Sequence, residues 1–390
     1  MRNRTSVLVS LASAIATLYA LEALISLAPS QLIDKLGTTL RKGPTVIAET
    51  DRMRNRNIVA FPYLQPDTFI DSASNGLKLN DTATVIPLSG IPKAMTVLCN
   101  ESGTTIGYRS DSLGFRNPQG IWDPKRLDAV VIGDSFAHGF CRTESETITG
   151  MLRSGGIRAA NTGLTGAGPL AELGVIREYV SAVKPRDVYW LFYEGNDLID
   201  LVSERETTLS KYLDPKFSQH LSANAAMIAQ TEKRYADSLL NQYKPPSFAA
   251  RARGFLTLRN LRTATGLYRG VKQPAMRDES REVALLREVL SVANHEVKSW
   301  GGRLHLVYLP ERRRFDSRTR AVTGENHRPD DVEKAVFSIT TDLDIPVLNA
   351  AAEFARQDDP TSLWNARRYH YNAKGYRIVA GLISDDLRTR

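Results

Sequence analysis

An alternation of short apolar runs with amphipathic segments, which begins at Leu127, constrains the fold of this chain more than any other feature. The runs have the length of buried strands, and several of them end in glycine or proline. They cover residues 129–132, 158–162, 187–193, 303–309 and 346–348. Strands that alternate with helices form a parallel sheet with helices on both faces. The sequence therefore predicts an α/β three-layer sandwich with a central parallel sheet of about five strands.

The segments between these runs have helical periodicity, and Pro169 stands where a proline favours the first turn of a helix. Helices are expected over residues 144–152, 169–183, 283–297, 330–342 and 374–387. The sandwich then comprises residues 126–204 and 281–390. Residues 30–125 are rich in Pro, Gly, Ser, Thr and Asn, which predicts short strands and turns in a membrane-proximal stalk that packs on the main domain. Residues 205–280 are predicted to be a mostly helical insertion. One role for it is that of a lid over the site.

Residues 1–29 are predicted to be a membrane anchor or a signal segment. Arg2 and Arg4 precede an apolar run from Val7 to Leu27, and about 20 such residues span a bilayer core. Arginines before the run favour a cytoplasmic N-terminus, with the rest of the chain exported. We favour an uncleaved single-pass anchor, because the run is long for a signal peptide and no clear cleavage site follows it; cleavage and secretion are the alternative. Glu22 is costly in both cases, and a place near the membrane interface would lower that cost.

The net charge of the 390-residue chain is +8, which suits a nucleic acid, a membrane surface or an acidic glycan as partner. No helix-turn-helix, zinc-finger or RNA-recognition signature is present, so no nucleic-acid partner is expected. Part of the excess lies in residues 251–272. A solvated basic face explains that stretch, and so does a face turned toward an anionic membrane.

The chain has two cysteines, Cys99 and Cys141. In an exported domain this even count predicts one disulfide, and the alternative is a pair of buried free thiols. Two thiols alone do not make a metal site, and we expect neither a metal nor a cofactor.

Four polar blocks mark predicted strand ends or the start of the last helix. Ser135 lies between a strand and a helix, where backbone N–H groups can stabilise an anion. Gly166, after the second strand, permits close backbone approach, and Asn196, after the third, can donate its amide to an oxyanion. His370 can act as general base toward a serine, whereas the rival His138 is awkwardly close to Ser135 in sequence. Each residue taken singly also has a structural explanation. Ser135 suits a helix cap, Gly166 and Asn196 suit turns, and a lone histidine such as His370 is often structural.

Together and in this order, the blocks resemble the SGNH, or GDSL-type, hydrolase superfamily over residues 127–200 and 282–390. The resemblance implies a flavodoxin-like fold and a serine esterase in which Ser135 is the nucleophile and His370 its base. It also implies an oxyanion hole made of the backbone N–H groups of Ser135 and Gly166 and the Asn196 side chain. The third block departs slightly from the family pattern, because no residue separates Gly195 from Asn196.

A larger departure concerns the aspartate that usually precedes the histidine and orients it. Arg367 and Arg368 stand at those positions, and an arginine disfavours an imidazolium nearby. Three explanations remain open. A backbone carbonyl orients His370 in a dyad, or another acid, Asp358 or Asp359, takes the role, or the site is weakened as an esterase.

The stretch 108–116 resembles the region before Gly-Asp-Ser in membrane-anchored bacterial members, although a loop that packs on the domain explains it too. We expect a protein of the bacterial inner membrane with its catalytic domain in the periplasm. Its substrate would be an acylated carbohydrate or lipid of the cell envelope. A polysaccharide O-acyltransferase, which uses the same acyl-serine, is one alternative. A catalytically weak protein that keeps the fold to bind a glycan is another.

Overall fold

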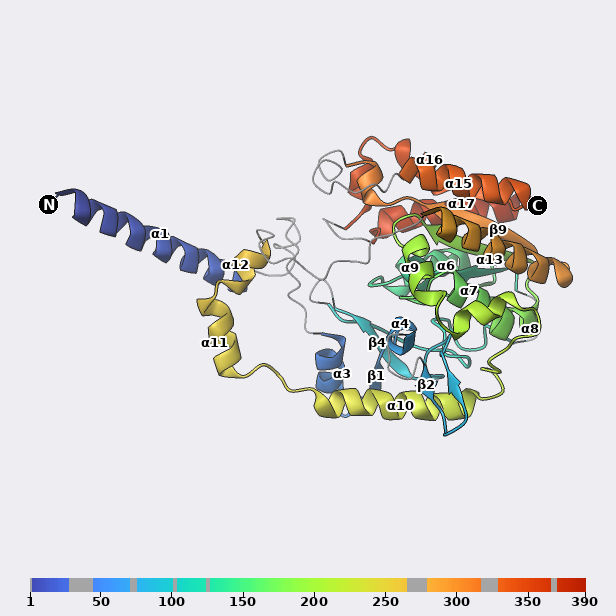
Figure 1. Cartoon of the computed structure of the whole chain (residues 1–390), viewed down its shortest axis with the longest axis horizontal. Coiled ribbons are helices and arrows are strands. Elements are labelled where there is room, and N and C mark those ends of the chain that lie inside the picture. Colours follow the sequence, from blue (N-terminus) through green and yellow to red (C-terminus); the bar gives the residue numbers. More distant parts are fainter. Residues whose placement is uncertain are drawn as a thin grey trace.

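The computed structural model describes residues 2–27, 45–70, 76–100, 104–123, 127–264, 279–316, 329–365 and 370–390. At its centre lies a five-stranded sheet with the strand order β10-β9-β8-β6-β7, in which every pairing is parallel. The strands are β6 (Ala129–Ile132), β7 (Ala159–Asn161), β8 (Asp187–Tyr193), β9 (Arg303–Leu309) and β10 (Val347–Asn349). The predicted α/β sandwich with a central parallel sheet is therefore confirmed (Figure 1).

Helices cover both faces of this sheet, because its strands carry apolar side chains on both sides. On β8, Val188, Trp190 and Phe192 point into one core and Tyr189 and Leu191 into the other. The first core is closed by α7 (Pro169–Val175), α9 (Asp197–Glu204), α13 (Glu279–Ser299) and α15 (Pro329–Asp342). The second is closed by α5 (Ser135–His138), α6 (Ile148–Ser154), α16 (Ala350–Ala355) and α17 (Ala373–Arg388). Each fully buried large apolar side chain contributes roughly 1.5–3 kcal/mol to the stability of this sandwich.

The strand order indicates where in the sheet a ligand site is expected. Along the chain, β7 is added on one side of β6 and β8 on the other, so the winding direction reverses between β6 and β8. In open α/β sheets, ligands bind at the carboxyl ends of the strands at such a reversal. Ser135 lies three residues after the end of β6, and Asn196 lies three residues after the end of β8.

The described part of residues 30–125 forms a layer that packs on the sandwich. Its strands are β1 (Ala60–Pro62), β4 (Met95–Cys99) and β5 (Ile106–Arg109) in one sheet, and β2 (Leu77–Lys78) and β3 (Thr84–Val85) in a small hairpin. Its helices are α3 (Val46–Arg54) and α4 (Asp67–Ile70). Leu88 and Phe115 of this layer are fully buried in the same core as α7 and α13.

The described part of the insertion is helical. It contains η3 (Thr208–Leu213), α10 (Ala225–Gln242), α11 (Phe248–Leu256) and α12 (Arg259–Ala264). Helix α10 lies against α3 and β1 of the N-terminal layer (Figure 1). The other short elements are η1 (Glu144–Glu146), η2 (Ile176–Val180), α8 (Ser181–Val183), η4 (Arg312–Arg314) and η5 (Pro360–Leu363).

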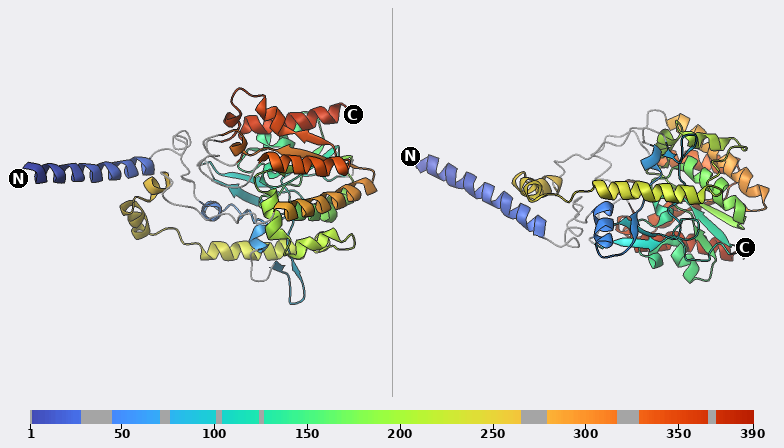
Figure 2. Two further views of the ribbon diagram at one scale, coloured as in Figure 1. Left: turned by 45° about the horizontal axis from the view of Figure 1, so that its top comes forward. Right: turned by 90° about the horizontal axis from the view of Figure 1, so that it is seen from below.

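Helix α1 (Arg2–Leu27) projects away from the body of the protein, and α12 lies beside its C-terminal end (Figure 2). Its segment Ser6–Leu27 has a mean hydropathy of 1.9 and is long and apolar enough to cross a membrane.

A disulfide joins Cys99, at the end of β4, to Cys141, which follows α5. The two Cα atoms are 5.6 Å apart, and the bridge closes 42 residues of chain. Leu98, Phe140 and Tyr108 pack around it. The bridge thus fastens the N-terminal layer to the segment that carries Ser135.

Replacing both cysteines by alanine should lower the free energy of unfolding by roughly 2–4 kcal/mol, because the unfolded chain regains the entropy of the open loop. Urea unfolding followed by circular dichroism measures this loss. A reducing agent should lower the urea midpoint of the wild-type protein and leave that of the double variant unchanged. An unaltered midpoint in the double variant would contradict the stabilising role.

Candidate active site

Ser135 is placed by a sharp corner between β6 and α5. Gly133 adopts a φ of +149°, and a Cβ there would lie 3.0 Å from Leu191 Cβ. Asp134 then caps the helix, because its Oδ1 accepts the backbone N–H of Phe136 at 2.8 Å. Ser135 is therefore the first residue of a helix at the carboxyl end of a buried strand.

His370 faces this serine from a segment 235 residues away in sequence. Its Nε2 lies 2.8 Å from Ser135 Oγ, which is hydrogen-bond distance. The imidazole lies between two aromatic rings, with its centroid 5.2 Å from that of Phe136 and 4.9 Å from that of Phe140. These rings come from the serine's own helix and the residues just after it, so they position the imidazole relative to Ser135.

The backbone from His370 onward is also fixed. The Tyr371 ring is fully buried, and its hydroxyl donates to the Pro310 carbonyl at 2.7 Å. Asn365 donates its N–H to the His370 carbonyl at 3.2 Å. Asn372 caps α17 through the N–H groups of Lys374 and Gly375. The histidine is thus held by packing and backbone contacts as well as by its hydrogen bond to the serine.

Asp359 was considered as an orienting acid for His370, but its carboxyl makes hydrogen bonds within the turn that begins η5. Its Oδ1 accepts the N–H and the hydroxyl of Thr361 at 3.0 and 2.7 Å, which caps η5. The hydrogen bond from Thr361 lowers the pKa of this carboxyl below its ordinary value. These contacts point it toward η5. Arg367 and Arg368 lie outside the described residues.

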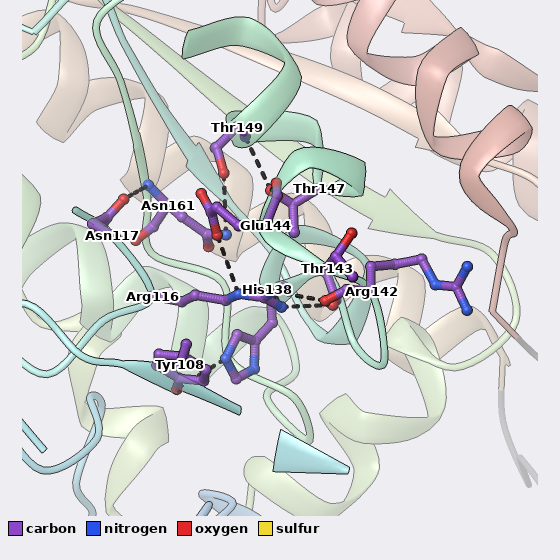
Figure 3. Close-up of polar contacts among 12 residues, drawn as sticks. Tyr108, Arg116, Asn117, His138, Arg142, Thr143, Glu144, Thr147, Thr149 and Asn161 are labelled. Atoms are coloured by element: carbon purple, nitrogen blue, oxygen red, sulfur yellow. Dashed lines mark hydrogen bonds and ion pairs between the residues drawn. The ribbon is translucent and has the colours of Figure 1, made fainter. Parts of the chain in front are cut away.

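His138 is directed away from Ser135. Its Nδ1 lies 3.0 Å from Thr165 Oγ1 and its Nε2 lies 3.1 Å from Tyr108 Oη (Figure 3). Burial, with a contribution from Arg116, lowers its pKa well below the ordinary value. His138 is therefore a neutral link between the loop after β7 and the N-terminal layer.

Asn196 reaches the same corner from β8. Its Nδ2 donates to Asp134 Oδ2 at 3.2 Å and to Asp200 Oδ2 at 2.7 Å. Asp134 Oδ2 is in turn 3.4 Å from Ser135 Oγ. The Asn196 amide thus lies beside the residue that precedes the serine.

The loop that carries Gly166 runs along the same corner. The Leu164 N–H donates to the Gly133 carbonyl at 2.9 Å, which fastens this loop to the turn before Ser135. Gly166 itself has a φ of +83°. The structure therefore brings the loops after β6, β7 and β8 together with the segment of His370.

Buried carboxyls surround the Asn196 side of this corner. Burial raises the pKa of Asp134 to about 6 and that of Glu204 to about 7. Burial also raises the pKa values of Glu172, Asp197 and Asp200 well above their ordinary range, with neighbouring carboxyls adding to the shift. A raised pKa reduces the negative charge that a carboxyl carries, so it also reduces the repulsion between this cluster and an oxyanion at Ser135.

Two asparagines that the sequence analysis did not single out hold this corner together. Asn161 donates its Nδ2 to the Ala137 carbonyl at 2.9 Å. Its N–H donates to Asn117 Oδ1 at 2.7 Å, and its carbonyl accepts Asn117 Nδ2 at 2.8 Å (Figure 3). Arg116 donates to the carbonyls of Gly139 and Arg142, which end α5 and the turn after it. The only sequence signal was the stretch 108–116, which a packing loop also explained.

No family model matches this chain, and no curated protein matches it. Its structure is similar to a lipase/acylhydrolase from Enterococcus faecalis, with 15% identity, a TM-score of 0.38, and coverage of 68% of this chain and 97% of that one. A member of the lipolytic protein G-D-S-L family from Veillonella parvula has 11% identity and a TM-score of 0.35, with coverage of 66% and 97%. A variant of an acetyl xylan esterase from Geobacillus stearothermophilus has 14% identity and a TM-score of 0.37, with coverage of 68% and 96%. Because these values are low, what the chain does is inferred from its own side chains.

Gly163→Ala should disrupt the site, because a Cβ at this position would lie 2.3 Å from the His138 nitrogen and 2.5 Å from the Ala137 carbonyl carbon. We expect a loss of about 1–3 kcal/mol in the free energy of unfolding, since backbone must shift to relieve the overlap. Gly381→Ala is the matched control, because a Cβ there meets no atom within 4 Å. Equal urea midpoints for the two variants would contradict the close approach.

The raised pKa of Asp134 predicts a pH dependence of stability. An aspartate in the unfolded chain titrates near about pH 3.9, whereas the folded-state pKa is about 6. Between these values the folded protein holds a proton that the unfolded chain has lost, so the contribution of Asp134 to stability falls as the pH rises through this window. Urea unfolding from pH 4 to 7 should therefore show a smaller decline for Asp134→Asn than for the wild-type protein. Parallel curves would contradict the raised pKa.

Proposed function

We propose that this chain is a serine hydrolase that cleaves carboxylic esters through an acyl-enzyme at Ser135, with His370 as its base. The observation that carries the proposal is the 2.8 Å contact between Ser135 Oγ and His370 Nε2 at the carboxyl edge of the sheet. A serine hydroxyl is a weak nucleophile until an adjacent base takes its proton, and a neutral imidazole at this distance does so.

In the proposed reaction, Ser135 Oγ bonds to the ester carbonyl carbon while its proton passes to His370 Nε2. The tetrahedral oxyanion accepts hydrogen bonds from the backbone N–H groups of Ser135 and Gly166 and from the Asn196 amide. Collapse breaks the bond to the alcohol oxygen, which takes the proton from His370. Water then attacks the acyl-serine, His370 accepts its proton, and the acid leaves as Ser135 regains a hydrogen. One oxyanion donor is worth about 3–4 kcal/mol of barrier.

Asn196 must change partners to act in this way. In the structure both hydrogens of its amide face the carboxyls of Asp134 and Asp200. An oxyanion at Ser135 is a charged acceptor, so its hydrogen bond with the Asn196 amide can replace one of these two contacts when substrate reacts. The hydrogen bond to Asp134 is the longer of the two, and we expect this one to break.

The substrate class follows from the predicted location. We propose that α1 anchors the protein in the bacterial inner membrane and that the catalytic domain acts in the periplasm on O-acyl groups of a carbohydrate or lipid of the cell envelope. The 22-residue apolar segment of α1 and the disulfide, which is typical of exported proteins, support this location.

Ser135→Ala should abolish labelling of the full-length protein by a fluorophosphonate probe and should lower its hydrolysis of a short-chain aryl ester by about 10⁴-fold or more. His370→Gln should have a similar effect, because the two side chains act as a unit. The matched controls are Ser145→Ala and His295→Gln, which change an exposed serine and an exposed histidine. Labelling and turnover that survive in Ser135→Ala would overturn the proposal. Acyl groups recovered on an added polysaccharide would identify transfer in place of hydrolysis.

A further inference from the structure

The excess positive charge of this chain is confined to one segment. Residues 238–277 contain eight basic side chains and no acidic one, which equals the net charge of +8, so the remainder of the chain is electrically balanced. The described part of this segment includes α11 and α12, in which Arg251, Arg253, Arg259 and Arg262 are all exposed. A single-sign patch on an otherwise balanced protein indicates an anionic partner.

Helix α11 also exposes large apolar side chains among these arginines. Phe248, Ala252 and Leu256 are spaced four residues apart and share one face, and Arg251 and Arg253 flank that face on either side. Phe248 is 87% exposed and Leu256 is 64% exposed. An apolar face bordered by arginines is typical of helices that lie in the plane of a membrane interface, with their cationic heads extended to the lipid phosphates.

The end of α1 is bound directly to this region. Glu22 accepts the backbone N–H groups of Asn260 and Leu261 at 3.0 and 2.7 Å, one on each carboxylate oxygen. The Tyr19 hydroxyl donates to the Leu256 carbonyl at 3.0 Å, and Asn260 Nδ2 donates to Ser26 Oγ at 2.8 Å. These contacts give the buried Glu22 a structural purpose, because its carboxylate satisfies backbone groups of the insertion.

The position of Glu22 sets the depth at which the two parts meet. Glu22 lies five residues before Leu27, the last residue of the apolar segment, which is about 7.5 Å along the helix axis. Interfacial helices lie about 5–10 Å below the membrane surface, at the boundary between headgroups and acyl chains. An α1 that spans the bilayer therefore holds α11 and α12 at the depth where an amphipathic helix is stable (Figures 1 and 2).

We propose that α11 and α12 dock on the surface of an anionic lipid bilayer, with Phe248 and Leu256 among the acyl chains and the arginines at the lipid phosphates. The proposal rests on the proposed anchoring by α1. The docked helices form a second membrane contact, joined to the anchor by Glu22, and fix the height of the catalytic domain above the bilayer.

The test uses the full-length protein reconstituted in vesicles of phosphatidylcholine with phosphatidylglycerol. Because Cys99 and Cys141 are joined, a cysteine introduced by Phe248→Cys is the only free thiol and takes a spin label. A label at 248 should show several-fold lower accessibility to a water-soluble nickel chelate than a label introduced by Met227→Cys. Met227 is 41% exposed on α10, at the end remote from α11, and serves as the control.

Charge is tested by the combined variant Arg251→Gln, Arg253→Gln and Arg259→Gln. Each basic side chain near an anionic surface contributes a factor of about five, so the docking equilibrium should shift about a hundredfold toward the free state. The label at 248 should then become accessible to the chelate. Vesicles of phosphatidylcholine alone should have the same effect on the protein that is labelled at 248 and keeps its three arginines.

Alkaline carbonate extraction separates this proposal from the anchoring by α1. If the protein resists extraction while the label at 248 is as accessible as the label at 227, α1 is an anchor and the docking proposal is wrong. If carbonate releases the protein, the anchoring proposal itself fails. Spin–spin broadening at 248 would mean that a second copy of the chain covers this face, which also overturns docking on lipid.

Discussion

The burial of β6 on both faces is the constraint on which the rest of the structure depends. All four of its residues are buried, and the strand lies between β7 and β8 with helices above and below. The polar residues next to β6 therefore lie at its two ends, with Asp128 before it and Asp134 after it. Parallel pairing makes the carboxyl ends of three neighbouring strands coincide, so Ser135, the loop of Gly166 and Asn196 lie at one edge of the sheet. The N–H of Thr162, which donates to the Val131 carbonyl at 2.9 Å, extends this pairing up to the site.

The same constraint explains how much the sequence could predict. Strands buried on both faces are continuous apolar runs, so β8 and β9 were predicted with the bounds that the structure has. Ser135 and Asn196 could be found because polar residues directly after such runs mark the carboxyl edge. His370 was found from its place in the order of the blocks and ahead of the last helix. Its 2.8 Å contact with Ser135 could come only from the structure.

Other parts depend on long-range contacts that leave no periodic signal. The pairing of Asn117 with Asn161 joins residues 44 apart through amide groups, and nothing in their neighbourhoods distinguishes them from turn residues. Residues 205–280 were predicted to be mostly helical, but the packing of α10 on α3 and β1 depends on apolar surface about 170 residues away in the chain. Asp359 looked suitable by proximity to His370 in sequence, while its contacts with Thr361 are those of an ordinary helix cap.

The disulfide has a topological consequence for the nucleophile. Ser135 lies between Cys99 and Cys141 in the chain, so it belongs to a covalent ring that also contains β5, Arg116 and Asn117. The side chains that tie the corner of α5 to the N-terminal layer are thus members of the same closed loop as the serine they support. Cytosolic thiols are kept reduced, and such a ring closes only in an oxidising compartment. In the proposed periplasmic location, completion of the corner around Ser135 is therefore coupled chemically to the export of the chain.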